Sequence, residues 1–160
     1  IDACVAKWKS WEETEKEILR IFDGKPGFID RALTETKNKY VDKEGLRREL
    51  TAFKAAWPEL KERIRKQIIP FEEVRRRLKL VGAPYEPEQL GVSRARFRDT
   101  FAKIPYMRSR FSNIDIAYRC GFMDEWLERL FGKGGVWEVG SPAPGSGEPA
   151  RSAAAPVPGA

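Results

Sequence analysis

Histidine is absent from this sequence of 160 residues. Its absence excludes imidazole metal ligands, histidine general acids and bases, and nucleophiles that histidine activates, as in Ser–His and Cys–His sites. Carboxylates are plentiful, yet none forms a recognisable pair in an otherwise apolar setting. The residues by themselves therefore predict no active site.

Cysteine is scarce, and long apolar runs are missing. Cys4 and Cys120 lie far apart without the close spacing of metal ligands, so we expect two free thiols in a reducing cytoplasm. No apolar stretch approaches the roughly 18 residues of a transmembrane helix, and we expect no membrane partner. A start methionine and a signal peptide are also missing. Because residues 3–8 already read as mid-helix, we expect a fragment of a longer protein.

Charge of neither sign dominates the sequence. The 30 basic and 24 acidic residues give a net charge of +6, which permits a nucleic-acid partner without requiring one. The two signs are interleaved along the chain, and we interpret them as a solvated, salt-bridged surface. The run Arg75, Arg76 and Arg77 is only a weak signal for phosphate binding, because consecutive residues point in different directions around a helix and do not share a face.

Apolar spacing predicts helices over almost all of residues 1–138, and no strand pattern of useful length occurs. We expect a first helix over residues 3–22. A restart at Ser10 is left open, because Ser10 and Glu13 have the spacing of a capping box. A second helix is predicted over residues 28–40.

Aspartate and proline mark the next boundaries. Asp42 suits the N-cap of a third helix, in which Trp57 is expected to be a core residue. Pro58 is placed in the first turn of a separate helix, and Pro70 in the first turn of the one after it. These elements predict an all-α fold of antiparallel helices joined by short loops.

The last helices carry clear start and stop signals. Gly82 is expected to end one helix in the left-handed conformation, and Gly121 to end another. The remaining signals are a Ser93 cap, a break at Pro105, a capping box of Ser112 with Asp115, and a final helix over residues 123–131. Residues 139–160 are rich in proline, glycine and alanine, and we expect a disordered tail there, outside a helical domain of residues 1–138.

Two neighbouring segments carry a family resemblance. They are GAPYEPEQLG at residues 82–91 and IPYMRSRFSNIDIAYRCGFMDE at residues 104–125. With the helical pattern upstream, residues 28–130 resemble the C-terminal end of bacterial sn-glycerol-1-phosphate dehydrogenases. These enzymes are grouped with the iron-containing alcohol dehydrogenases, glycerol dehydrogenases and dehydroquinate synthases.

The resemblance implies an enzyme larger than this chain. Such enzymes join an N-terminal nucleotide-binding domain to a C-terminal helical domain, with a divalent metal (Zn, Ni or Fe) in the cleft between them. They reduce dihydroxyacetone phosphate with NADH or NADPH, which would supply glycerophosphate for phospholipid-type synthesis. The partners implied are the missing nucleotide-binding domain and a small phosphate substrate, and a homo-oligomer is left open.

The chain departs from the family in the residues that carry the chemistry. The family's metal ligands are one aspartate and two histidines, and this chain has neither a histidine nor a glycine-rich nucleotide loop. No catalytic, NAD(P)-binding or metal-binding residue can therefore be assigned, and the chain alone should be inactive. Asn113 also stands where the family usually has an aliphatic residue. The one site hypothesis is that Arg108 and Arg110 contact the substrate phosphate, the alternative being acidic partners or solvent.

Two other functions compete with the dehydrogenase interpretation. Residues 114–124 also resemble the helix-turn-helix of arabinose-operon-type activators, which bind DNA. However, the helix that would be the recognition helix begins with Asp124, Glu125 and Glu128, which would repel DNA phosphates. We therefore do not expect a nucleic-acid partner. The other alternative is a non-catalytic helical interaction domain, for which the five tryptophans are the argument.

Overall fold

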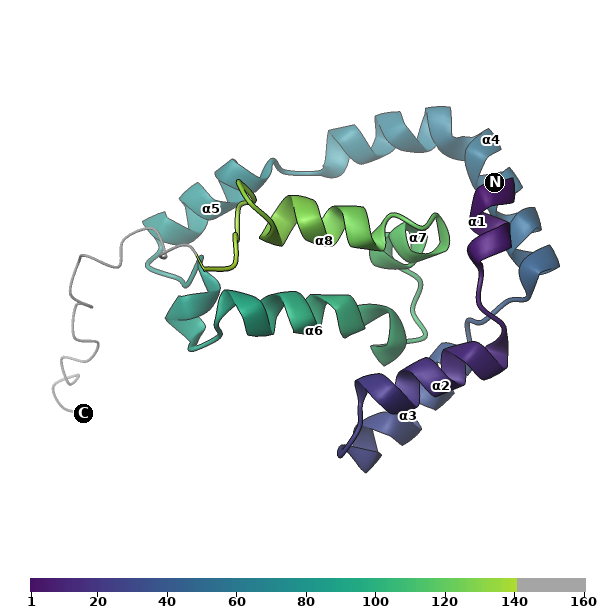
Figure 1. The fold of residues 1–160 in the computed structure, drawn as a ribbon. Helices are drawn as coiled ribbons and strands as arrows, with labels where there is room; N and C mark the ends of the chain where they lie inside the picture. Colours follow the sequence, from purple (N-terminus) through teal and green to yellow (C-terminus); the bar gives the residue numbers. More distant parts are fainter. Residues whose placement is uncertain (141–160) are drawn as a thin grey trace, which may run out of the picture.

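The computed structural model describes residues 1–140 and is all-helical over that range, as predicted (Figure 1). Val139 and Gly140 are exposed, and the rest of the tail predicted to be disordered lies outside the described residues. The elements are α1 (Asp2–Lys7), α2 (Trp11–Ile21), α3 (Pro26–Lys37), α4 (Lys43–Gln67), α5 (Phe71–Leu80), a short 3-10 helix η1 (Pro87–Leu90), α6 (Arg94–Met107), α7 (Asn113–Arg119) and α8 (Met123–Phe131).

The helix expected over residues 3–22 is divided into α1 and α2. The division lies at Ser10, whose hydroxyl accepts from the Glu13 amide at 3.2 Å while the Glu13 carboxylate accepts from the Ser10 amide at 2.7 Å. This capping box starts α2 and confirms the restart that was left open. The next helix, α3, begins before the predicted residue because Pro26 supplies its first turn.

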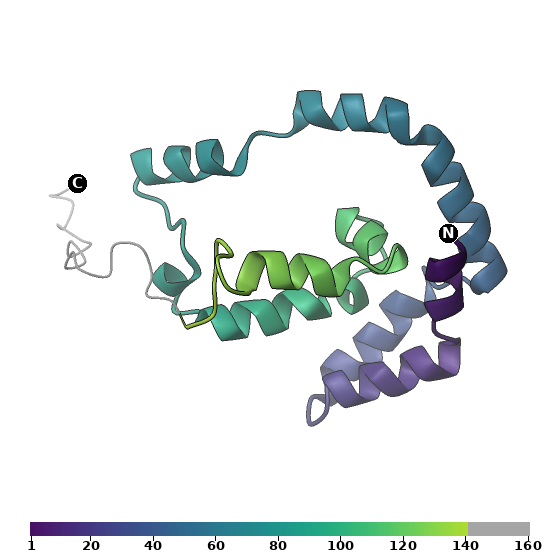
Figure 2. The same ribbon diagram turned by 45° about the horizontal axis from the view of Figure 1, so that its top comes forward.

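Helix α4 begins where predicted and continues further than predicted. The Asp42 carboxylate accepts from the Gly45 amide at 2.7 Å and caps the helix. The expectation that Pro58 starts a new helix is wrong, because α4 runs through Pro58 to Gln67. The helix is visibly bent (Figure 2), and an interior proline, which removes one backbone hydrogen bond, is a sufficient cause.

Helix α6 likewise continues through the proline that was expected to end it. Pro105 lies inside α6, which ends at Met107, so its missing amide costs only one bond in the last turn. The other signals of this region are confirmed. The Ser93 hydroxyl accepts from the Arg96 amide at 3.2 Å, and Gly82 has a φ of 69°.

Three small clusters of buried side chains form the core. One joins α2, α3 and α6 around Ile18 and Tyr106, and a second joins α6, α7 and α8 around Leu127 and Phe131. The third joins α1 to the start of α4 around Leu46. Helices α6 and α8 lie side by side, and α2 pairs with α3 below them (Figure 1).

The second half of α4 and all of α5 leave this body as a curved arm, here defined as residues 57–81 (Figures 1 and 2). The arm carries eight basic and four acidic residues. Trp57, predicted to lie in the core, is 42% exposed. It belongs to a set of exposed apolar side chains along the arm: Trp57, Ile64, Ile68, Ile69, Phe71, Val74, Leu80 and Val81.

Within residues 1–140, no helix combines the length and the apolar character that crossing a bilayer requires.

Candidate functional site

The two arginines of the phosphate hypothesis lie in the loop that joins α6 to α7. Arg108 and Arg110 are both exposed, and neither makes an ion pair within residues 1–140. The acids considered as their partners bind other cations: Asp99 pairs with Lys103, Asp115 with Lys39 and Glu125 with Arg129. Both arginines therefore face solvent and are not paired with these acidic residues.

The start of α7 is already filled by the protein's own carboxylate. Asp115 Oδ2 accepts from the Ser112 amide at 2.8 Å and from the Ser112 hydroxyl at 2.9 Å, which confirms the predicted capping box. In the same loop, the Ser109 amide donates to Glu35 Oε2 at 2.7 Å. Hydrogen bonding from the Ser109 side chain, together with that from its amide, holds the pKa of Glu35 below its ordinary value. The amides of Ser109 and Ser112 are therefore not available to an incoming phosphate.

A buried ionic cluster ties α7 to the N-terminal half of the chain. Lys39 Nζ lies 2.5 Å from Asp115 Oδ1, and both side chains are largely buried. Arg119, which is 7% exposed, donates to the backbone carbonyl of Lys39 at 2.5 Å and forms an ion pair with Glu49. Sequence reasoning missed this cluster, because its partners are distant along the chain and no local pattern joins them.

Two tyrosines lie beside this cluster. The Tyr106 hydroxyl donates to the Tyr118 hydroxyl at 3.3 Å, and the two rings meet edge to face. Burial raises the pKa of both phenols above the ordinary value, most strongly for Tyr106. Both groups therefore remain protonated at neutral pH and act as hydrogen-bonding groups, not as bases.

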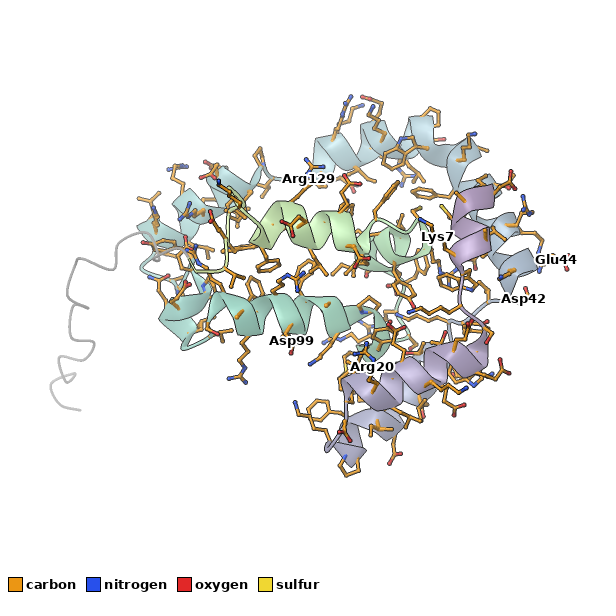
Figure 3. The ribbon with its side chains drawn as sticks, viewed as in Figure 1. Lys7, Arg20, Asp42, Glu44, Asp99 and Arg129 are labelled. Atoms are coloured by element: carbon orange, nitrogen blue, oxygen red, sulfur yellow. The ribbon has the colours of Figure 1, made fainter. Side chains whose placement is uncertain are left out.

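A large cavity opens between α1, α2, α6 and the turn that precedes α8. Its volume is about 910 Å³, and the two tyrosines form part of its wall. Lys7, Arg20 and Asp99 reach it from three different helices (Figure 3). Both cysteines of the chain also line it. Its lining thus combines aromatic rings, charges of both signs and two thiols.

Helices α7 and α8 are joined by a tight turn at Gly121. Gly121 adopts a φ of 71°, which confirms that it ends α7, and α8 starts two residues later. Both helices pack on α6. Asp124 and Glu125 occupy the first turn of α8, as the sequence suggested. In a helix-turn-helix the start of the second helix approaches DNA, and acidic residues there would repel its phosphates.

The segment before α6 is held by buried ion pairs. Arg94 is 6% exposed, with its Nε 2.8 Å from Glu88 Oε1, and Arg75 of α5 pairs with Glu86. The side-chain oxygen of Gln89 accepts from the amides of Tyr85 and Glu86 at 2.7 and 2.9 Å. Residues 82–91 are therefore a fixed connection between the arm and the body. Arg75 is used here as a structural residue, while Arg76 and Arg77 pair with Glu73 on the surface.

Across residues 1–140, no three carboxylate or thiol side chains gather closely enough to hold a metal ion. Comparisons with protein-family models, with curated proteins and with solved structures found no match to this chain.

Proposed function

We propose that this chain forms the helical part of an NAD(P)- and metal-dependent dehydrogenase that reduces dihydroxyacetone phosphate to sn-glycerol 1-phosphate. The sequence of residues 82–125 supports the choice of family. The structural observation that carries the proposal is the exposed apolar face of the arm at Trp57, Ile64, Ile68 and Ile69. A face of this kind marks a surface that another protein component covers.

The charge of the arm favours a different domain over a second copy of the same chain. The arm has four more basic than acidic residues, so two arms laid against each other would repel. A nucleotide-binding domain with an acidic docking surface would be attracted instead. This is the domain that the family resemblance implies.

The residues of this chain do not fit the metal of the proposed enzyme. The sequence has no histidine, and the described part has no cluster of metal-binding side chains. We therefore assign no chemical step to this chain. Its proposed contributions are a wall of the substrate cleft and two solvent-facing cations, Arg108 and Arg110, for the substrate phosphate.

The test uses the protein encoded by the complete reading frame around this sequence. Purified protein is assayed for oxidation of NADH and of NADPH that depends on dihydroxyacetone phosphate, with Zn²⁺, Ni²⁺ or Fe²⁺ added. Arg110→Ala is expected to raise KM for dihydroxyacetone phosphate by more than about threefold. The matched control is Arg98→Ala, which removes another exposed arginine that makes no ion pair within residues 1–140. A folded protein without turnover under every condition would overturn the proposal.

Docking on the arm is tested separately with one added charge. Ile64→Glu places a carboxylate in the uncovered apolar face, whereas Ala55→Glu places one on the opposite side of α4. Ile64→Glu is expected to abolish turnover of the complete protein and to release this helical part to limited proteolysis. Ala55→Glu is expected to change neither. Equal effects of the two variants would remove the argument from the arm.

DNA binding is the second candidate, and the helix–glycine–helix geometry of α7 and α8 is the observation that favours it. A fluorescently labelled random duplex at low salt measures it directly. A DNA-binding protein would retain the duplex and lose it steeply as salt rises. We expect no retention, because Asp124 and Glu125 carry negative charge to the start of α8.

A further inference from the structure

Cys4 lies beside Cys120 although the two residues are distant in sequence. Cys4 belongs to α1 and Cys120 follows α7, 116 residues later. Cys4 Sγ donates to the backbone carbonyl of Cys120 at 3.3 Å. Both cysteines are free and half-buried, and no other cysteine occurs in the sequence.

The large cavity gives small molecules access to both sulfurs. Cys4 and Cys120 line its wall, and at about 910 Å³ it has the size of a small-molecule site. Among its charged residues, Lys9 pairs with Glu17, Lys103 with Asp99 and Glu125 with Arg129. Lys7, Arg20, Arg119 and Asp124 also line it, and Arg119 is held by Glu49.

Lys7 and Arg20 therefore provide positive charge in the cavity that both cysteines line. Neither makes an ion pair within residues 1–140. Asp124 is the acidic lining residue that also makes no ion pair there, so the two cations outnumber it. Figure 3 shows Lys7 on α1 and Arg20 on α2, and both residues line this cavity. An anionic molecule is favoured there over a cationic one.

We propose that Cys4 and Cys120 form an intramolecular disulfide by exchange with a small anionic disulfide of the glutathione disulfide class. The Cys4 thiolate attacks one sulfur of glutathione disulfide, the bond between its two sulfurs breaks, and one glutathione thiolate leaves. The Cys120 thiolate then attacks Cys4 Sγ and displaces the second glutathione. Two protein thiols are oxidised, and one glutathione disulfide is reduced to two glutathione molecules.

The order of the two attacks follows from the surroundings of the thiols. Burial raises the pKa of Cys120 above its ordinary value, and the neighbouring Cys4 adds to this effect. A raised pKa leaves less thiolate for the first attack. Cys120 is therefore assigned the second, intramolecular step, in which its proximity to Cys4 compensates for its low thiolate fraction.

The disulfide would join two parts of the fold that are distant in the chain. It would tie α1 to the turn before α8, a region now bridged by the edge-to-face contact of Trp8 with Tyr118. Closing a loop of this length restricts the unfolded chain strongly, so the oxidised protein should be the more stable form.

The experiment incubates the reduced chain of 160 residues with glutathione disulfide, blocks remaining thiols with iodoacetamide and measures the intact mass. We expect a loss of two hydrogens, no blocked cysteine and a cross-linked peptide that contains Cys4 and Cys120. The melting temperature should rise by at least ~5 °C and return when dithiothreitol is added. Glutathione adducts without the cross-link, or two thiols that stay reactive to iodoacetamide, would overturn the proposal.

Two sets of variants separate the parts of the proposal. Cys4→Ser and Cys120→Ser should each take up at most one glutathione, with no rise in melting temperature. If one of these variants fails to fold, the intact mass of the oxidised wild-type chain still shows whether the disulfide forms. Lys7→Glu with Arg20→Glu should slow exchange with glutathione disulfide by about threefold or more, but not exchange with the cationic disulfide cystamine. Equal slowing with both reagents contradicts the charge preference.

Discussion

At the scale of single residues, Asp115 links local and long-range structure. Its carboxylate caps α7 through Ser112 and also pairs with Lys39, 76 residues away. The cap could be predicted, because serine and aspartate three residues apart are a local signal. The pairing with Lys39 and the burial of Arg119 could not, because they depend on how distant segments meet.

Replacing Asp115 should therefore cost more than an ordinary helix cap. Asp115→Ala removes the cap and leaves Lys39 without its partner at a site that is largely buried. We expect a loss of about 3 kcal/mol in the free energy of unfolding, measured by urea denaturation. The control is Asp99→Ala, which breaks the exposed pair with Lys103 and should cost less than about 1 kcal/mol. Equal losses would mean that Asp115 is hydrated in solution.

The tyrosine pair predicts the behaviour of the chain at high pH. Burial raises the pKa of Tyr106 and of Tyr118 in the folded state above the value of 10.0 in the unfolded chain. The folded state then binds more protons, so this contribution to stability is complete below pH 10 and is lost progressively above it. Absorbance at 295 nm should show these two phenols ionising only together with unfolding. Smooth ionisation of all four tyrosines before the loss of helical signal would contradict it.

At the scale of secondary-structure elements, local signals predicted where helices begin better than where they continue. Ser10, Asp42, Ser93 and Ser112 all cap the helices that the sequence assigned to them. Prolines were misread, because a proline disfavours a helix without forbidding it. Helix α4 continues through Pro58, since good helix formers such as Ala55 and Ala56 precede it and the surrounding surface is exposed.

Removing the interior proline should therefore strengthen α4. Pro58→Ala restores an amide that can bond to the carbonyl of Lys54, and the bend should relax. We expect more helical signal in far-ultraviolet circular dichroism and a gain of about 1–2 kcal/mol in stability. Pro70→Ala is the matched control, because Pro70 lies at the N-cap of α5, where no helical bond is missing. A larger gain at Pro70 would point to a different origin of the bend.

At the scale of the whole molecule, periodicity indicated apolar helix faces but could not show what covers them. The stripe through Trp57 and Ile64 reads like a core stripe, and a core position was predicted for Trp57. In the folded chain the packed clusters lie among the other helices, and the arm keeps its apolar side chains exposed. The class of fold was therefore predictable from sequence, but the open shape was not. That shape depends on which faces find partners within the same chain.

Matched truncations of one packed and one exposed apolar side chain test this difference between the core clusters and the arm. Leu127 is 5% exposed in the cluster of α6, α7 and α8, whereas Ile68 of the arm is 63% exposed. Leu127→Ala should cost about 3 kcal/mol in the free energy of unfolding, because it leaves a cavity in packed surroundings. Ile68→Ala should cost less than about 1 kcal/mol, because solvent already reaches that side chain. If Ile68→Ala proved as costly as Leu127→Ala, the chain would cover the arm by itself in solution, and no partner would be needed to explain its apolar face.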